Sequence, residues 1–168
     1  MPTRKMLQVI PKTLTFTPTG GTAVVFSDFS EAVSFTYEDS YSDISSQSSD
    51  YAIGKMLTGR AASMKAVVNN FDLQQMQAMV STTPADYAVA TDTLTLNSGN
   101  FNVNYGLLVF VGRDTTTGKD ITITLKRAVA KVSGDLAFGK DSEAKAGLQF
   151  DAVRDGSNTA VVTIAYAV

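Results

Sequence analysis

The 168-residue sequence contains no cysteine and no histidine. Without cysteine there is no disulfide framework, and no thiolate is available as a nucleophile or metal ligand. Without histidine the chain lacks the usual proton carrier near neutral pH and the commonest ligand of transition metals. A serine nucleophile would then need lysine as its base, and no spacing singles out such a pair. We therefore expect neither an enzyme nor a bound cofactor or metal.

Charge is also scarce. Charged residues make up 18% of the chain and the net charge is −2, which gives no overall attraction to nucleic acid or to membranes. So few charges indicate either a surface covered by partners or a dry, threonine-rich monomer surface. No run approaches the roughly 18 apolar residues of a membrane-spanning helix. Because Met6–Ile10 is too short for a signal-peptide core, we expect synthesis in a cytoplasm.

Alternating apolar residues dominate a chain whose length suits one domain, 1–168. Alternation predicts half-buried strands, because successive side chains of a strand point to opposite faces. Strands are predicted at Thr13–Thr17, Ala23–Phe29, Ala32–Tyr37, Tyr51–Thr58, Arg60–Val68, Thr93–Leu96 and Tyr105–Val111. Within the last of these, Leu107–Val111 is apolar on both faces, which is typical of a central strand covered on both sides.

The last third of the chain has the clearest pattern. Apolar residues occupy odd positions in Ile121–Leu125 and even positions in Ala128–Val132, which predicts a β-bulge near Lys126–Ala128. Two further strands follow at Gly147–Ala152 and Thr159–Tyr166. They are joined through Asp155-Gly156, and Asp-Gly between two alternating runs predicts a β-hairpin.

One short helix is predicted, from Asp72 to Val80. Asp72 with Gln75 three residues later forms a capping box, and Leu73, Met76 and Val80 fall on one helical stripe. A helix this short is marginal alone, so its stripe should lie on the sheet. The predicted fold is therefore mainly β, a sandwich or barrel of antiparallel strands with one short flanking α-helix.

A polar, serine-rich stretch, Glu38–Asp50, interrupts the strands and is predicted to be a long loop. It lies in a segment, Thr13 to Gly54, that has six acids and no lysine or arginine. Basic residues gather instead at Arg4, Lys5, Lys12, Lys126, Arg127 and Lys131. This distribution indicates either a solvated acidic loop or one half of a head-to-tail contact between copies, which would generate an open filament.

Two patterns that invite a catalytic or phosphate-binding interpretation are weak. Gly112–Lys119 has one residue too many between its glycines for a phosphate loop, and Asp120 stands where Ser or Thr should hold Mg²⁺. We interpret it as the loop of a hairpin between Val111 and Ile121. The carboxylate pairs Glu38/Asp39 and Asp141/Glu143 lie in polar sequence and are interpreted as solvated surface.

A family resemblance rests on Ile121–Ala128, a turn centred on Gly134, and Gly147–Asp155. Together these segments resemble the C-terminal end of bacteriophage major tail tube proteins, the subunits of the hollow tube of long-tailed phages. The element order elsewhere, with one short helix among strands, is similar to that family over most of the chain. The resemblance implies a β-sandwich or barrel, six copies in a ring, and rings stacked into a tube through which DNA passes during ejection.

The resemblance also implies a location and partners. It implies a virion protein made in the host cytoplasm, with copies of itself, a tape-measure protein and a tail terminator as partners. In that family a long loop and the terminal segments bridge rings; by position, these would be the loop Glu38–Asp50 and a flexible arm at 1–12. The candidate contacts between subunits are Arg4, Lys5, Glu38, Asp39, Tyr41, Asp43, Ile44 and Asp50.

A conduit must not hold its DNA, because each neutralised phosphate adds to affinity and a tube repeats every contact. Lumen-facing positions should therefore be acidic or small and polar. Gln149 and Asp151, on the face opposite Leu148 and Phe150, are candidates for that lining.

Two other functions stay open. One is a carbohydrate- or protein-binding β-sandwich on a virion or cell surface, for which exposed aromatics would serve; the candidates are Tyr41, Tyr51, Tyr87 and Phe101. The other is the tube subunit of a contractile secretion or bacteriocin apparatus, which needs the same ring and stack. A small hydrolase is disfavoured by the missing histidine and cysteine.

Overall fold

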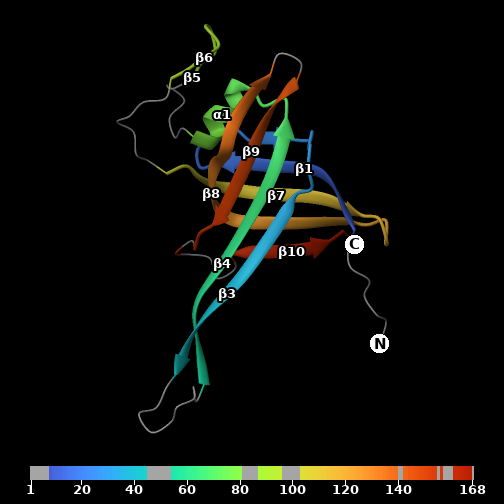
Figure 1. The fold of residues 1–168 in the computed structure, drawn as a ribbon, viewed down its shortest axis with the longest axis vertical. Coiled ribbons are helices and arrows are strands. Elements are labelled where there is room, and N and C mark those ends of the chain that lie inside the picture. The colour runs from blue at the N-terminus through green and yellow to red at the C-terminus, as the bar shows by residue number, and fades with distance from the viewer. Residues whose placement is uncertain are drawn as a thin grey trace.

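The computed structural model describes residues 8–44, 54–80, 87–95, 103–139, 142–154, 156 and 161–167. This part of the chain is mainly antiparallel β-structure with one short helix, which confirms the predicted fold class (Figure 1). In chain order the elements are β1 (Val9–Pro18), β2 (Val24–Phe26), β3 (Ser34–Ile44), β4 (Gly54–Asn69), α1 (Leu73–Val80), β5 (Tyr87–Ala88), β6 (Thr93–Leu94), β7 (Tyr105–Asp114), β8 (Asp120–Gly139), β9 (Ser142–Ala152) and β10 (Val162–Tyr166).

The main sheet has the order β2-β1-β7-β8-β9-β4-β3, with β10 also paired to β8. The 20-residue strand β8 belongs to two layers, because its first half pairs with β7 and β10 and its second half pairs with β9. Leu108 pairs with Leu125 but Gly106 pairs with Ala128, so β8 carries one extra residue between them. This confirms the predicted bulge. Since a bulge bends its strand, the sheet folds over itself and the strands of the two layers cross (Figure 1).

The core lies between the layers. Leu14, Phe16, Leu108 and Leu125 from the first layer and Met64, Leu148 and Phe150 from the second are fully buried. The rings of Phe16 and Phe150, one from each layer, lie 5.4 Å apart between centroids. Close packing also fixes the backbone: a Cβ on Gly147 would lie 2.2 Å from the carbonyl oxygen of Ser133 on β8. Only glycine therefore lets β9 approach β8 at this point.

Helix α1 begins as predicted. The Gln75 N–H donates to Asp72 Oδ1 (2.6 Å) and the Asp72 N–H donates to Gln75 Oε1 (3.1 Å), so the capping box is confirmed. The predicted apolar stripe is wrong in part, because Leu73 is 39% exposed while Met79 is buried against the core. The buried side of the helix therefore includes Met79 in place of Leu73. Asn104 also fastens it, donating from its side chain to the carbonyl of Ala78.

The C-terminal hairpin and the turn at Gly134 were both wrong. Strand β10 pairs with β8, from Val162 beside Leu125 to Tyr166 beside Ile121, whereas β9 pairs with β8 and β4. The bulge explains this, because β9 leaves the edge of β8 there, and the backbone groups of Ile121–Leu125 on that edge are then paired by β10. Strand β8 continues through Gly134 to Gly139.

The predicted loop at Glu38–Asp50 is also wrong in its described part, because Glu38–Ile44 belongs to β3. Likewise, the strands predicted on either side of Gly59 form one strand, β4, with Thr58 as an extra residue opposite β3. Strands exposed on both faces carry no apolar alternation, which is why their polar sequence resembled a loop. Finally, β7 is central in its sheet, but Leu107 is 39% exposed, so only one of its faces is covered.

Candidate assembly surfaces

The strands β3 and β4 extend beyond the rest of the sheet. Strand β9 pairs with β4 only over Ser63–Asn69. Further out, and among the described residues, β3 and β4 pair only with each other, from Tyr37 beside Ala62 to Ile44 beside Gly54. We call Tyr37–Ile44 with Gly54–Ala62 the arm; Figure 1 shows it projecting away from the body. At about 3.3 Å per residue its eight β3 residues span roughly 26 Å.

Each face of the arm carries large apolar side chains. The face that continues the core side of the sheet bears Tyr37 and Tyr41 on β3 and Leu57 on β4; the other face bears Ile44 and Met56. The extra residue at Thr58 shifts the register, so Leu57 shares a face with Tyr41, its cross-strand partner. These five side chains are between 41% and 57% exposed.

Ion pairs lie between the apolar residues of the arm. Arg60 Nε lies 3.2 Å from Asp39 Oδ1, and Lys55 Nζ lies 3.8 Å from Asp43 Oδ1. The Tyr41 hydroxyl donates to Asp39 Oδ2 (3.4 Å). Because exposed ion pairs contribute only about 0–1 kcal/mol and an isolated hairpin is marginal in water, the arm has little stability of its own.

The exposed apolar side chains of the arm provide a driving force for association. Complete burial of such a side chain from water is worth about 1.5–3 kcal/mol. With each side chain roughly half-buried already, covering all five would contribute on the order of 5 kcal/mol. Apolar patches of this kind mark interaction sites on proteins.

The arm contains most of the predicted contact residues. Glu38, Asp39, Tyr41, Asp43 and Ile44 lie on it, whereas Arg4, Lys5 and Asp50 lie outside the described residues, as does 1–7 of the predicted terminal arm. Asp39 and Asp43 already form ion pairs with bases of the arm itself, so they do not need a basic patch on another copy as a partner. Sequence reasoning missed Leu57 and Met56, because the gap at Gly59 hid the pairing with Tyr41 and Ser42 that brings them into the arm.

The predicted lining residues Gln149 and Asp151 share the outward face of β9. Gln149 Nε2 donates to Asp151 Oδ1 (2.7 Å), and Lys131 Nζ lies 2.8 Å from Asp151 Oδ2. Burial alone would raise the pKa of Asp151, but these contacts outweigh it and hold the pKa below its ordinary value. Lys65 stands beside Gln149 on β4, so this β9 face carries bases as well as an acid.

The outward face of the first layer is different, because most of it is uncharged. At one end the same face continues to Arg113 beside Asp120. We call the uncharged part the threonine face. By register it consists of Thr13, Thr15, Thr17, Leu107, Val109, Val111, Thr122, Thr124, Thr163 and Ala165. It therefore offers small polar and apolar groups over four adjacent strands.

The loop between β7 and β8 is a hairpin loop, as predicted. Asp114 is buried there; its Oδ1 accepts from the Thr116 N–H and its Oδ2 from the Thr117 hydroxyl, both at 2.8 Å. The backbone hydrogen bond from Thr116, partly opposed by burial, lowers the pKa of Asp114. The carboxylate thus takes the donors that a phosphate would need.

The other candidate groups are only partly described. Tyr51, Phe101 and Asp141 lie outside the described residues, and of Tyr87 and Glu143 only the backbone is described. Across the described ranges no group of three or more acidic residues is arranged to hold a metal ion. Of the helical structure described, nothing is long and apolar enough to cross a membrane.

Comparison with known proteins gives structural similarity alone. No family model and no curated protein matches the chain. Among solved structures it is similar to a chain of the anti-feeding prophage baseplate, at 12% identity and a TM-score of 0.45 over 88% of this chain and 91% of that chain. It is also similar to a chain of the tail of an empty GTA particle, at 14% identity and a TM-score of 0.42 over 94% and 96%. At these TM-scores the similarity is limited to the general path of the backbone.

Proposed function

We propose that the chain is a structural subunit that assembles with copies of itself into the hollow tube of a phage-type tail. The observation that carries the proposal is the arm, which holds five large apolar side chains in water on a two-stranded extension. Such an extension gains stability when a partner covers it. Another copy of the same chain is a partner that is always available.

The sequence supports a tube in particular. Of the segments that resemble tail tube proteins, the strand at Ile121–Leu125, the bulge after it and the strand at Gly147–Ala152 are present in the fold, while the turn at Gly134 is not. On this proposal six copies form a ring and rings stack into a tube of the virion. A tape-measure protein and a tail terminator would be its partners, and double-stranded DNA would pass through it.

The lumen of such a tube must not retain DNA. The threonine face meets this requirement over its ten uncharged residues, and the two charged residues at its end, Arg113 and Asp120, are adjacent and of opposite sign. The β9 face meets it less well, since Lys131 is paired with Asp151 but Lys65 adds a further base. We therefore add the threonine face to Gln149 and Asp151 as a candidate lining.

The test is negative-stain electron microscopy of the purified protein over a range of concentrations. We expect rings or hollow filaments above a critical concentration. A protein that stays dispersed as monomers at every concentration would exclude a tube subunit. Tubes of a contractile secretion or bacteriocin apparatus need the same assembly and would give the same result.

A second candidate is a ligand-binding β-sandwich on a virion or cell surface. The exposed rings of Tyr37 and Tyr41 favour it, because tyrosine provides flat contact area for sugars and peptides. A binding module would remain monomeric and would lose glycan or peptide binding when Tyr41 is replaced by serine. A tube subunit would lose assembly instead.

A further inference from the structure

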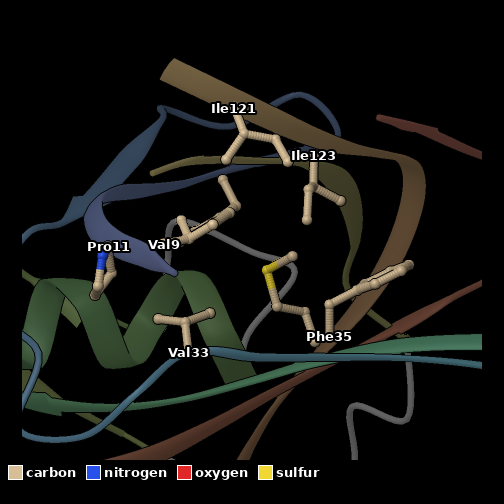
Figure 2. Close-up of a pocket in the computed structure, with 8 residues that line it drawn as sticks. Val9, Pro11, Val33, Phe35, Ile121 and Ile123 are labelled. Carbon is tan, nitrogen blue, oxygen red and sulfur yellow. The ribbon is translucent and has the colours of Figure 1, made fainter. Parts of the chain in front are cut away.

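An apolar cavity of about 130 Å³ opens between the two layers near the base of the arm. Six of its lining residues are labelled in Figure 2: Val9, Pro11, Val33, Phe35, Ile121 and Ile123. Val9 and Ile121 face Val33 and Phe35 across the space (Figure 2). The remaining lining is apolar too, so the cavity offers no hydrogen-bonding side chain to a polar ligand.

The wall of the cavity on the first layer continues onto β10. Ile164 stands beside Ile123, and Tyr166 beside Ile121, on the same face of the sheet. Unlike their buried partners, Ile164 is 54% exposed and Tyr166 is 41% exposed. The core-side face of the first layer therefore extends past the second layer and is left uncovered along β10.

The second layer also has a core-side face that is left partly uncovered. Phe35 lines the cavity, and Tyr37 and Tyr41 follow it on the same side of β3, where they are 52% and 57% exposed and no described strand of the first layer covers them. Tyr41 lies six residues beyond Phe35 on a paired strand, roughly 20 Å away. The ring of Tyr41 therefore cannot return to the cavity of its own chain.

We propose that the arm of one copy packs across β10 of a second copy, with Leu57 seated in the cavity and Tyr41 over its rim. This contact rests on the proposed self-assembly and specifies it. Each copy then supplies the layer that the other lacks. The contact is heterologous, since the arm and the receiving surface are different parts of the chain, and it therefore propagates from copy to copy.

Size and polarity favour Leu57 as the seated side chain. An apolar cavity of about 150 Å³ stays dry and accepts a group the size of benzene, so this slightly smaller cavity suits one isobutyl group. Leu57 brings no polar atom, whereas burying a tyrosine hydroxyl without a partner is costly. At the rim, the Tyr41 hydroxyl keeps its bond to Asp39 (3.4 Å).

The first test fills the cavity. Val33→Phe places a ring in the space, so we expect a folded protein of equal or higher melting temperature that no longer sediments as an assembly. Ser34→Phe, on the opposite face of the same strand, is the matched control and should assemble like the parent. Assembly of Val33→Phe at the parental critical concentration would overturn the contact.

The second test does not depend on the filled variant folding. The chain has no cysteine, so Val33→Cys with Leu57→Cys introduces only two thiols. Within one copy Leu57 stands beside Tyr41, eight residues along β3 from Val33, which is roughly 26 Å. A disulfide needs its Cα atoms within about 7 Å, so it can form only between copies.

Oxidation of the assembled Val33→Cys, Leu57→Cys variant should give a ladder of disulfide-linked chains on a non-reducing gel. Val33→Cys with Met56→Cys, from the opposite face of the arm, is the control and should give monomers. An assembled sample without a ladder, or a ladder through Met56 alone, would overturn this contact while leaving self-assembly intact. A parent protein that never assembles would overturn both.

Discussion

Truncating the arm's core-side face should disable assembly and leave the fold intact. The variant is Tyr41→Ser with Leu57→Ser, a cross-strand pair on the arm. In the monomer these side chains are 57% and 41% exposed, so the folded state loses the burial that they already have, on the order of 2 kcal/mol, together with the hydrogen bond from Tyr41 to Asp39. The melting temperature should therefore fall by about 4–8 °C.

The assembled state also loses the burial that the contact adds. Completing the burial of two half-exposed side chains is worth on the order of 2 kcal/mol per contact. Since 1.4 kcal/mol is a factor of ten in an equilibrium constant, the critical concentration should rise roughly 30-fold. We would measure it by pelleting a concentration series and follow folding by circular dichroism.

Val89→Ser is the matched control, because Val89 is 79% exposed in the turn after β5, away from the arm. It should assemble at the parental concentration. If the double variant also pellets at that concentration, within a factor of two, the arm is not an assembly contact and the reasoning fails.

Four further predictions concern the described fold and its faces. Hydrogen bonds lower the pKa of Asp114. Its contribution to stability is therefore present above the ordinary carboxyl value of about 3.9 and is lost as the pH falls through the lower folded-state value. The melting temperature of Asp114→Asn should change less with pH below 4 than that of the parent, and parallel profiles would contradict this. Gly147→Ala, with a Cβ 2.2 Å from the Ser133 carbonyl oxygen, should cost about 1–3 kcal/mol in urea melts, whereas Gly156→Ala, which meets nothing within 4 Å, should be neutral. A double-mutant cycle of Lys131→Ala and Asp151→Ala should give a coupling of about 0.2–1 kcal/mol, since the pair is 50% and 38% exposed; a coupling of several kcal/mol would mean a buried pair. In particles that carry the protein, Thr124→Lys should slow DNA ejection at low salt if the threonine face lines the lumen, and Asp151→Lys should do so if the β9 face does; normal ejection with both would exclude both linings.

The buried parts of the fold were predictable because burial imposes a pattern. Apolar alternation located the strands around Leu14, Leu108 and Ile123, and the shift of phase after Leu125 located the bulge. The capping box predicted the start of the helix because it depends on two side chains close in sequence, Asp72 and Gln75.

The partner of β10 was not predictable from local sequence. Asp155-Gly156 favours a hairpin locally, but β10 instead completes the edge of β8 beside Ile121 and Ile123. That choice depends on where β9 leaves β8, which is a property of the folded sheet.

The candidate site was predicted only by composition. The acids and Tyr41 led to the prediction that the segment Glu38–Asp50 contacts another subunit. Its polar sequence nevertheless indicated a loop, because a strand with solvent on both faces has no apolar period. Leu57 and the cavity near the base of the arm depend on pairings 16 or more residues apart in sequence, so no local signal could reveal them.

Hydrogen exchange of the arm, in the monomer and after assembly, tests the central claim most directly. In the monomer the amides of Glu38–Ile44 and Gly54–Ala61 belong to an isolated pair of strands and should exchange quickly. We expect assembly to slow them by at least about 100-fold, as on the order of 3 kcal/mol of burial is gained there. Equal exchange in both states would contradict the claim that another copy covers the arm.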